Sequence, residues 1–291
     1  DGSGDVYFDV SSWGSYGELT NQSVENLTQG ESENAAKKNP EDFALWKGHK
    51  PHEPVTAAWP APWGAGRPGW HLECSAMATR YLGESFDIHG GGMDLRFPHH
   101  ENELAQSRAA GHDYARHWMH NALVLAGGHK MSKSLGNFWT ISDTFEHVDP
   151  LELRYALLNA PYRQPIEFNM AMLEESKKHH ERMMEVYGKA LVAAESSEWK
   201  GHNNLETAAE RFTAGMNDDF NTRTAMVEVQ TVVRELRALL DSNADSGLVA
   251  AGAGWLNEMV SLNTQQPETI ILPEKDLVAD PSGWWSIRQA I

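Results

Sequence analysis

The chain has 291 residues, of which 41% are hydrophobic and 22% charged, as is typical of a globular protein with about two or three domains. It shows no apolar stretch long enough to span a bilayer, no signal peptide and a single cysteine, Cys74, so we expect a cytoplasmic protein with no membrane span and no internal disulfide. The net charge of −17 has the wrong sign for general nucleic-acid binding, so a nucleic-acid partner would have to meet a local basic patch or another part of the protein.

The first part of the chain predicts one strand followed by irregular connections. Valine and phenylalanine alternate with other residues over positions 5–10, which is the pattern of a half-buried strand. Residues 21–38 are polar with little periodicity and predict a surface segment of helix and loop. Residues 51–68 are rich in proline and glycine and predict a connector of turns, with tryptophans as packing anchors.

An alternation of strand and helix follows. We expect a helix over residues 73–82, a strand over 85–88, and a glycine loop at 90–92 that turns the chain into a helix over 98–110. Another strand is expected over residues 122–125. This order is the unit of an open α/β sheet, which binds its ligands at the carboxyl ends of its strands.

Past residue 165 the pattern becomes helical and predicts a bundle. Asn169 and Asn221 are both placed to cap a helix, the second of which runs to Leu240. The first of these helices is predicted to bury one face, made of Leu173, Met184, Tyr187 and Leu191.

The segment His-Lys-Met-Ser-Lys-Ser-Leu-Gly-Asn, which begins at His129, combines two lysines with small hydroxyl residues. Lys130 and Lys133 offer point charges for phosphate oxygens, and Ser132 can donate a hydrogen bond to the same group. Such a loop is suited to wrapping a polyphosphate. The alternative is a solvated loop of lysine and serine that needs no ligand.

Three residues form a candidate metal site. His99 and Glu103 are four positions apart on a predicted helix, so their side chains project from the same face, and Cys74 lies on another element. Thiolate, imidazole and carboxylate are all zinc ligands. The alternatives are a helix-start histidine, a surface glutamate and a cysteine that packs as a small hydrophobe.

Read together, three segments carry a family resemblance. The run Pro-Gly-Trp-His-Leu-Glu-Cys-Ser-Ala-Met occupies residues 68–77, and Phe-Asp-Ile-His-Gly-Gly-Gly-Met-Asp-Leu-Arg-Phe-Pro-His-His-Glu-Asn-Glu occupies 86–103. The Lys-Met-Ser-Lys-Ser run at 130–134 completes the order. The chain thereby resembles the cysteinyl-tRNA synthetases, which are class I aminoacyl-tRNA synthetases, over residues 5–240.

The resemblance implies that Cys74, His99 and Glu103 bind one Zn²⁺ per subunit. The family has a fourth ligand, a cysteine on the first strand of its catalytic domain, and this chain has no second cysteine. Zinc binds thiolate well, whereas an alkanol is a poor ligand that stays protonated. A zinc ion can therefore separate cysteine from serine where an apolar pocket could not.

Two further residues match substrate-binding positions of the family. Trp70 would lie against the bound cysteine and Asp94 would meet its ammonium group. The alternatives are a tryptophan that anchors the core and an aspartate that caps a loop. His89 could support the site or could be an ordinary core histidine.

The implied reaction has two steps, activation of L-cysteine by ATP, with Mg²⁺, and transfer of the cysteinyl group to tRNA(Cys). Lys130, Ser132 and Lys133 would bind the ATP, and the two lysines would stabilise the charge of the departing pyrophosphate. We expect a monomer without a membrane partner.

The family's second ATP motif, His-x-Gly-His, does not occur in this sequence. We therefore expect a fragment without the N-terminal half of the catalytic domain, which would be inactive by itself.

Two other interpretations remain open. One is the related ligase that joins cysteine to an amino-sugar glycoside in mycothiol synthesis, although residues 102–107 and the helical second half favour the synthetase. The other is a non-catalytic binding module derived from a synthetase.

The predicted fold class is α/β, with the C-terminal half of a Rossmann-like class I catalytic domain followed by a helical bundle. The expected boundaries give the catalytic part residues 1–125, the lysine loop with a stem-contact region residues 126–165, and the bundle residues 166–265. Residues 266–291 would form a tail of uncertain structure.

Overall fold

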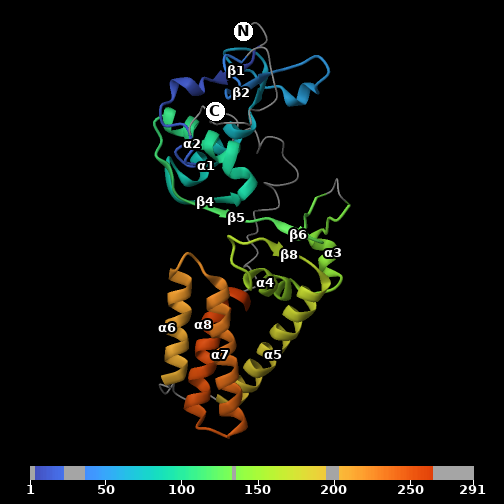
Figure 1. The fold of residues 1–291 in the computed structure, drawn as a ribbon, viewed down its shortest axis with the longest axis vertical. Coiled ribbons are helices and arrows are strands. Elements are labelled where there is room, and N and C mark those ends of the chain that lie inside the picture. Colours follow the sequence, from blue (N-terminus) through green and yellow to red (C-terminus); the bar gives the residue numbers. More distant parts are fainter. Residues whose placement is uncertain (1–3, 23–36, 133–135, 195–202, 265–291) are drawn as a thin grey trace. The chain divides into compact units, whose positions relative to one another are not determined.

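The computed structural model describes residues 4–22, 37–132, 136–194 and 203–264 (Figure 1). The expectations for residues 23–36 and for the tail lie outside these ranges. The chain divides after Asn121 into two compact units, which are described separately below. None of the described helices is both long and apolar enough to cross a membrane.

The first unit begins with a small antiparallel sheet. Its strands are β1 (Val6–Phe8), β2 (Phe43–Gly48) and β3 (Gly66–Pro68), in the order β1-β2-β3. The predicted first strand ends two residues early, because the Asp42 carboxylate accepts the backbone N–H of Val10, where a short 3₁₀ turn begins.

The rest of this unit is the predicted open α/β arrangement. It consists of α1 (Trp70–Leu82), β4 (Ser85–Gly92), α2 (Glu101–Ala109) and β5 (Tyr114–Asn121), as Figure 1 shows. The strands β4 and β5 run parallel, α1 contacts β4 and α2, and α2 contacts β5. The strand β5 was not predicted.

The predicted glycine loop is wrong, because all three glycines belong to the end of β4. Gly91 has to be glycine here, since an added Cβ would lie 2.9 Å from Cε1 of His100. The turn into the helix comes later, through residues Met93–Leu95 and Arg96–His100, so α2 begins at Glu101 rather than at residue 98.

The second unit starts with a small sheet of β6 (Val124–Ala126), β7 (His129–Lys130) and β8 (Ile166–Glu167), in the order β7-β6-β8. The predicted strand at 122–125 corresponds to β6. Gly127 and Gly128 form the turn between β6 and β7 with φ of 63° and 75°, and the Glu167 carboxylate accepts both of their N–H groups. The short helices α3 (Ile141–Phe145) and α4 (Pro150–Leu158) follow β7 along the chain.

Four long helices complete the second unit. They are α5 (Met170–Ala194), α6 (Asn203–Asn217), α7 (Thr222–Asp241) and α8 (Ser246–Thr264). Both predicted caps are confirmed: Asn169 accepts the N–H of Met172 at 2.9 Å, and Asn221 accepts that of Thr224 at 3.2 Å. The helices enclose an apolar core that includes Met183, Leu205, Val229, Val233, Leu236 and Leu256.

The predicted buried face of α5 is wrong at Leu191, whereas Met184 and Tyr187 are partly buried against the core of the bundle. Leu173 is fully buried, but Leu191 is 53% exposed, and the buried residues later in the helix are Met183, Val186 and Ala190. The buried stripe rotates around the helix because α5 contacts α4 as well as α7 and α8. A single periodic face cannot describe a helix whose packing partners change along its length.

Candidate metal and substrate site

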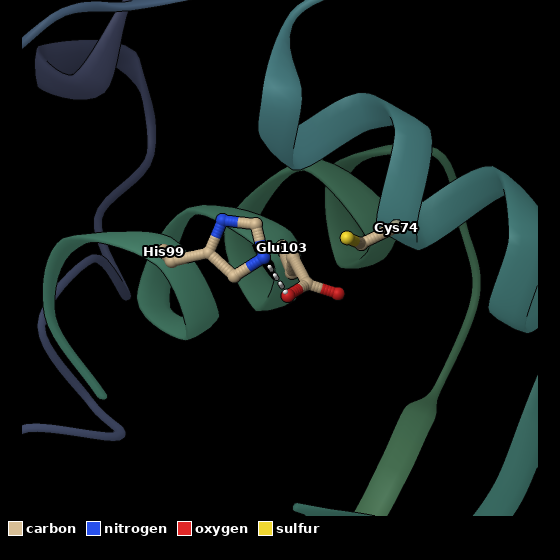
Figure 2. Close-up of side chains that lie close together, drawn as sticks. All are labelled: Cys74, His99 and Glu103. Atoms are coloured by element: carbon tan, nitrogen blue, oxygen red, sulfur yellow. Dashed lines mark ion pairs between the residues drawn. The ribbon is translucent and has the colours of Figure 1, made fainter. Parts of the chain in front are cut away.

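Three side chains in the first unit converge on a common point, as Figure 2 shows. Cys74 lies on α1, His99 on the turn before α2, and Glu103 on the first turn of α2. One ligand atom from each lies within 4.8 Å of the other two. His99 and Glu103 are almost completely buried, and Cys74 is partly buried.

The two carboxylate oxygens of Glu103 have different surroundings. Oε2 accepts a hydrogen bond from the Tyr114 hydroxyl at 2.6 Å and lies 3.4 Å from Nε2 of His89. Oε1 lies 2.9 Å from Nε2 of His99, yet it is buried without a hydrogen-bond partner among the described residues. Oε2 is thus held in place by its hydrogen bond. Oε1 and Nε2 of His99 lie side by side, where a cation could bind to both.

The protonation of these groups depends on their burial. Burial opposes ionisation of Glu103, but the neighbouring His89, His99 and Tyr114 side chains outweigh it and lower the pKa of the carboxyl group to about 2. Burial and then the nearby Glu103 charge raise the pKa of the Cys74 thiol to about 11. A divalent cation between the two would relieve this repulsion and favour the thiolate. Sulfur, imidazole nitrogen and carboxylate oxygen together fit zinc.

Trp70 and His71, at the start of α1, flank the His99 ring. The Trp70 ring stacks on His99, with centroids 4.1 Å apart, and remains 53% exposed. On the buried side, Nδ1 of His71 lies 2.7 Å from Nδ1 of His99. The Trp70 ring therefore lies beside one of the candidate metal ligands. Asp94 is exposed in the turn that follows β4, five residues before His99.

A second group of potential ligands shares Glu103. His89, His100 and Glu103 also offer atoms within 4.8 Å of one another. Nδ1 of His100, however, lies 2.8 Å from Nε2 of His120, and burial lowers the pKa of His100 to about 4. Both groups suit zinc, and the group that includes Cys74 is the one that adds a sulfur ligand. No role was predicted for His71, His100, His120 or Tyr114, although the adjacent histidines of the His-His-Glu-Asn-Glu run could have indicated a histidine cluster.

The lysine loop belongs to the second unit. Lys130 ends β7 and is exposed, Ser132 is partly buried, and Lys133 lies outside the described residues. The Asn137 side chain joins the ends of the loop: it accepts the N–H of Ser132 at 3.0 Å and donates to the carbonyl oxygens of Ala126 and Lys130. Asn137 is the last residue of the lysine-rich motif, and this bridging role was not predicted.

Comparisons with known proteins define the class of this fold. Residues 1–178 match the family described as the tRNA synthetases class I (C) catalytic domain, and residues 211–262 match the DALR domain. The chain belongs to the class I (C) tRNA synthetase family. The resemblance to class I synthetases and the predicted fold class are therefore confirmed.

The relatives with curated names are cysteine–tRNA ligases. A protein of that name from Nocardioides is 48% identical over 272 residues, which cover 92% of this chain and 56% of the relative. Another from Kocuria rhizophila is 49% identical over 258 residues, covering 87% of this chain and 53% of the relative. The chain therefore spans about half the length of these relatives.

A solved structure supports the fold alone. The LeuRS chain in the ternary LeuRS–tRNA–LeuAMS complex of Agrobacterium radiobacter is similar with a TM-score of 0.59 and 17% identity. The similarity covers 71% of this chain and 32% of that chain.

Proposed function

We propose that this chain supplies the amino-acid site and part of the ATP site of a cysteine–tRNA ligase. The observation that carries the proposal is the buried Oε1 of Glu103, which lacks a hydrogen-bond partner among the described residues but faces Nε2 of His99 at 2.9 Å. With the Cys74 thiol beside them, these atoms make a ligand set suited to one zinc ion. The names of the relatives support cysteine as the amino acid.

The three ligand residues would give the site its selectivity. When bound, zinc supplies a Lewis acid that takes a thiolate far better than an alkanol oxygen, so cysteine is bound and serine is rejected. Glu103 and Cys74 bring two negative charges that keep the ion in place, and His99 completes the protein's share of the ligands. These three ligands leave coordination positions free, one of which the substrate sulfur would take.

Other side chains would orient the substrate. The exposed part of Trp70, next to His99, offers an apolar wall for the cysteine side chain. Asp94, exposed beyond the end of β4, offers a carboxylate for the ammonium group. The cysteine carboxylate is itself the nucleophile that attacks the α-phosphorus of ATP, so no side chain of this chain needs to attack.

The lysine loop would act on the phosphates. Lys130, Lys133 and the Ser132 hydroxyl bind the ATP, which enters with Mg²⁺, and the two lysines stabilise the negative charge on the departing pyrophosphate. The cysteinyl group then passes from the adenylate to the terminal ribose of tRNA(Cys). With a net charge of −17, the chain meets this tRNA through local basic groups rather than through its overall field. The same proposal includes a cytoplasmic monomer.

Cobalt substitution tests the metal and the substrate together. The chain loaded with Co²⁺ should show a thiolate-to-cobalt charge-transfer band that is lost in Cys74→Ser. Adding L-cysteine should intensify the band, because a second sulfur joins the metal, and L-serine at the same concentration should leave it unchanged. An equal response to both amino acids would contradict the proposed specificity.

A further inference from the structure

His71 is a fully buried histidine with no part in the proposed ligand set. It is the second residue of α1, is 0% exposed, and places its Nδ1 only 2.7 Å from Nδ1 of His99. Two imidazole nitrogens at this distance share one hydrogen: one nitrogen must donate and the other must accept. The tautomer of one ring therefore fixes that of the other.

Metal binding decides which ring donates. Nε2 of His99 lies 2.9 Å from Oε1 of Glu103, on the side of the ring that faces Cys74 and the proposed metal position. A nitrogen that binds a metal must present a lone pair, so the His99 hydrogen has to be on Nδ1. This hydrogen then points at Nδ1 of His71, which must accept it and carry its own hydrogen on Nε2.

We propose, on the basis of the proposed metal site, that His71 is a positioning residue that selects the metal-binding tautomer of His99. The opposite tautomer has an attractive alternative partner, since an Nε2–H of His99 could donate to the ionised Oε1 of Glu103. That bond would occupy both ligand atoms at once and exclude the cation. When His71 carries its hydrogen on Nε2, its Nδ1 accepts from His99, stabilises the Nδ1–H form of His99 and leaves Nε2 and Oε1 to the metal.

The surroundings of His71 hold it in the orientation that this role needs. The Gln106 side chain, on α2, donates to the His71 carbonyl oxygen at 2.7 Å and joins the two helices at this point. The Phe43 ring of β2 meets the His71 ring edge to face, at 5.5 Å and 90°. Trp70 stacks against His71 at 5.4 Å as well as against His99. Rotation of either imidazole would disturb this packing, so the acceptor is in place before the metal arrives.

Two substitutions separate hydrogen bonding from packing. His71→Phe keeps an aromatic ring and removes the acceptor, whereas His71→Asn keeps an acceptor, because the Asn Oδ1 occupies nearly the place of the histidine Nδ1. We expect His71→Phe to weaken Zn²⁺ binding by about 10- to 100-fold, the usual effect of losing the partner of a metal-binding histidine. His71→Asn should retain most of the affinity. His112→Phe, at a partly buried histidine outside both groups of potential ligands, is the matched control.

The experiment measures Zn²⁺ affinity by competition with a chromogenic chelator on the 291-residue chain and its three variants. Long-range ¹H–¹⁵N NMR spectra of the zinc-loaded chain report the His99 tautomer directly, and circular dichroism melting shows that each variant is folded. The expected result is Nδ1-protonated His99 in the wild type, weak binding by His71→Phe alone, and normal binding by His71→Asn and His112→Phe.

The possible failures are distinguishable. If the wild-type chain binds no Zn²⁺, the proposed metal site is wrong, and the role of His71 is wrong with it. If the wild type binds Zn²⁺ and His71→Phe binds equally well, the metal site stands and the role of His71 is overturned. Equal losses in folded His71→Phe and His71→Asn would also overturn it, since packing alone would then explain the effect.

Discussion

The metal-ligand set and the lysine loop differ in how firmly the fold fixes their side chains. Glu103 and His99 are buried, and Tyr114 and His71 contact the sides of them that face away from the proposed ion. Lys130 is exposed, and the Asn137 side chain makes hydrogen bonds at the base of its loop. Recognition of one sulfur atom requires ligands set in advance, whereas stabilising the charge of a leaving pyrophosphate requires lysines that can follow it.

The largest effect should come from breaking the buried set. Glu103→Gln should reduce Zn²⁺ affinity by more than about a hundredfold, because it removes a charged ligand and leaves the Tyr114 hydroxyl facing an amide. Glu73→Gln, one residue before Cys74, makes the same charge change outside the proposed ligand set. Chelator competition on both variants measures the difference, and equal affinities would contradict the assignment of Glu103.

A substitution in the lysine loop should cause a loss of similar size, but in the rate of adenylate formation rather than in Zn²⁺ affinity. In an enzyme with the full length of the relatives, Lys133→Ala should slow cysteinyl-adenylate formation by about a hundredfold, or roughly 3 kcal/mol, since its charge acts mainly in the transition state. Cysteine affinity should change little. Rapid-quench measurement of the first turnover separates the two quantities. An unchanged rate of adenylate formation would rule out this role for Lys133.

The affinity for Zn²⁺ should depend on pH through the Cys74 thiol. The pKa of the Cys74 thiol is raised to about 11, so the metal-free thiol is protonated at neutral pH and must release its proton when zinc binds. Zn²⁺ affinity should therefore rise about tenfold for each pH unit between pH 7 and 9, and the rise should end as the pH approaches the thiol pKa. Competition titrations across this range, corrected for chelator protonation, measure the slope, and no slope would mean that the thiol is not a ligand.

The smallest effect is expected at the base of the lysine loop. Asn137→Ala removes the acceptor of the Ser132 N–H and the donor to the Lys130 carbonyl, which should loosen the loop at a cost of about 1–2 kcal/mol. We expect a several-fold increase in the KM for ATP and normal Zn²⁺ affinity. Steady-state pyrophosphate exchange in the full-length enzyme measures it. A loss of metal binding in this variant would contradict the separation of the two regions.

Much of the arrangement could be predicted because the informative residues are local in sequence. The four-residue spacing of His99 and Glu103 predicted that both side chains lie on the same side of the chain. The helix caps Asn169 and Asn221 could each be predicted from a single residue. The role of His71 could not be predicted, because its contact with His99 spans 28 positions and exists only once α1 packs on α2. Such contacts depend on tertiary packing, which periodicity does not encode.

The strands of the first unit show a second limit. The strand β5 contains Arg116, His117 and Trp118 without an alternation of apolar residues, and its partner β4 ends in three glycines. Residues 85–88 were predicted as a strand, but neither the glycines that follow them nor the sequence of β5 resembles a strand by composition. The parallel pairing is instead supported by the packing of helices, and glycine at position 91 makes room for the neighbouring His100 ring.

The most direct test of the central claim is X-ray absorption at the zinc edge of the loaded chain. The account predicts one sulfur neighbour at about 2.3 Å, from Cys74, and nitrogen or oxygen neighbours at about 2.0–2.1 Å. Adding L-cysteine should raise the sulfur count from one to two, and adding L-serine should leave it at one. A sulfur count that does not change with L-cysteine would contradict the claim that the metal binds the substrate thiol directly.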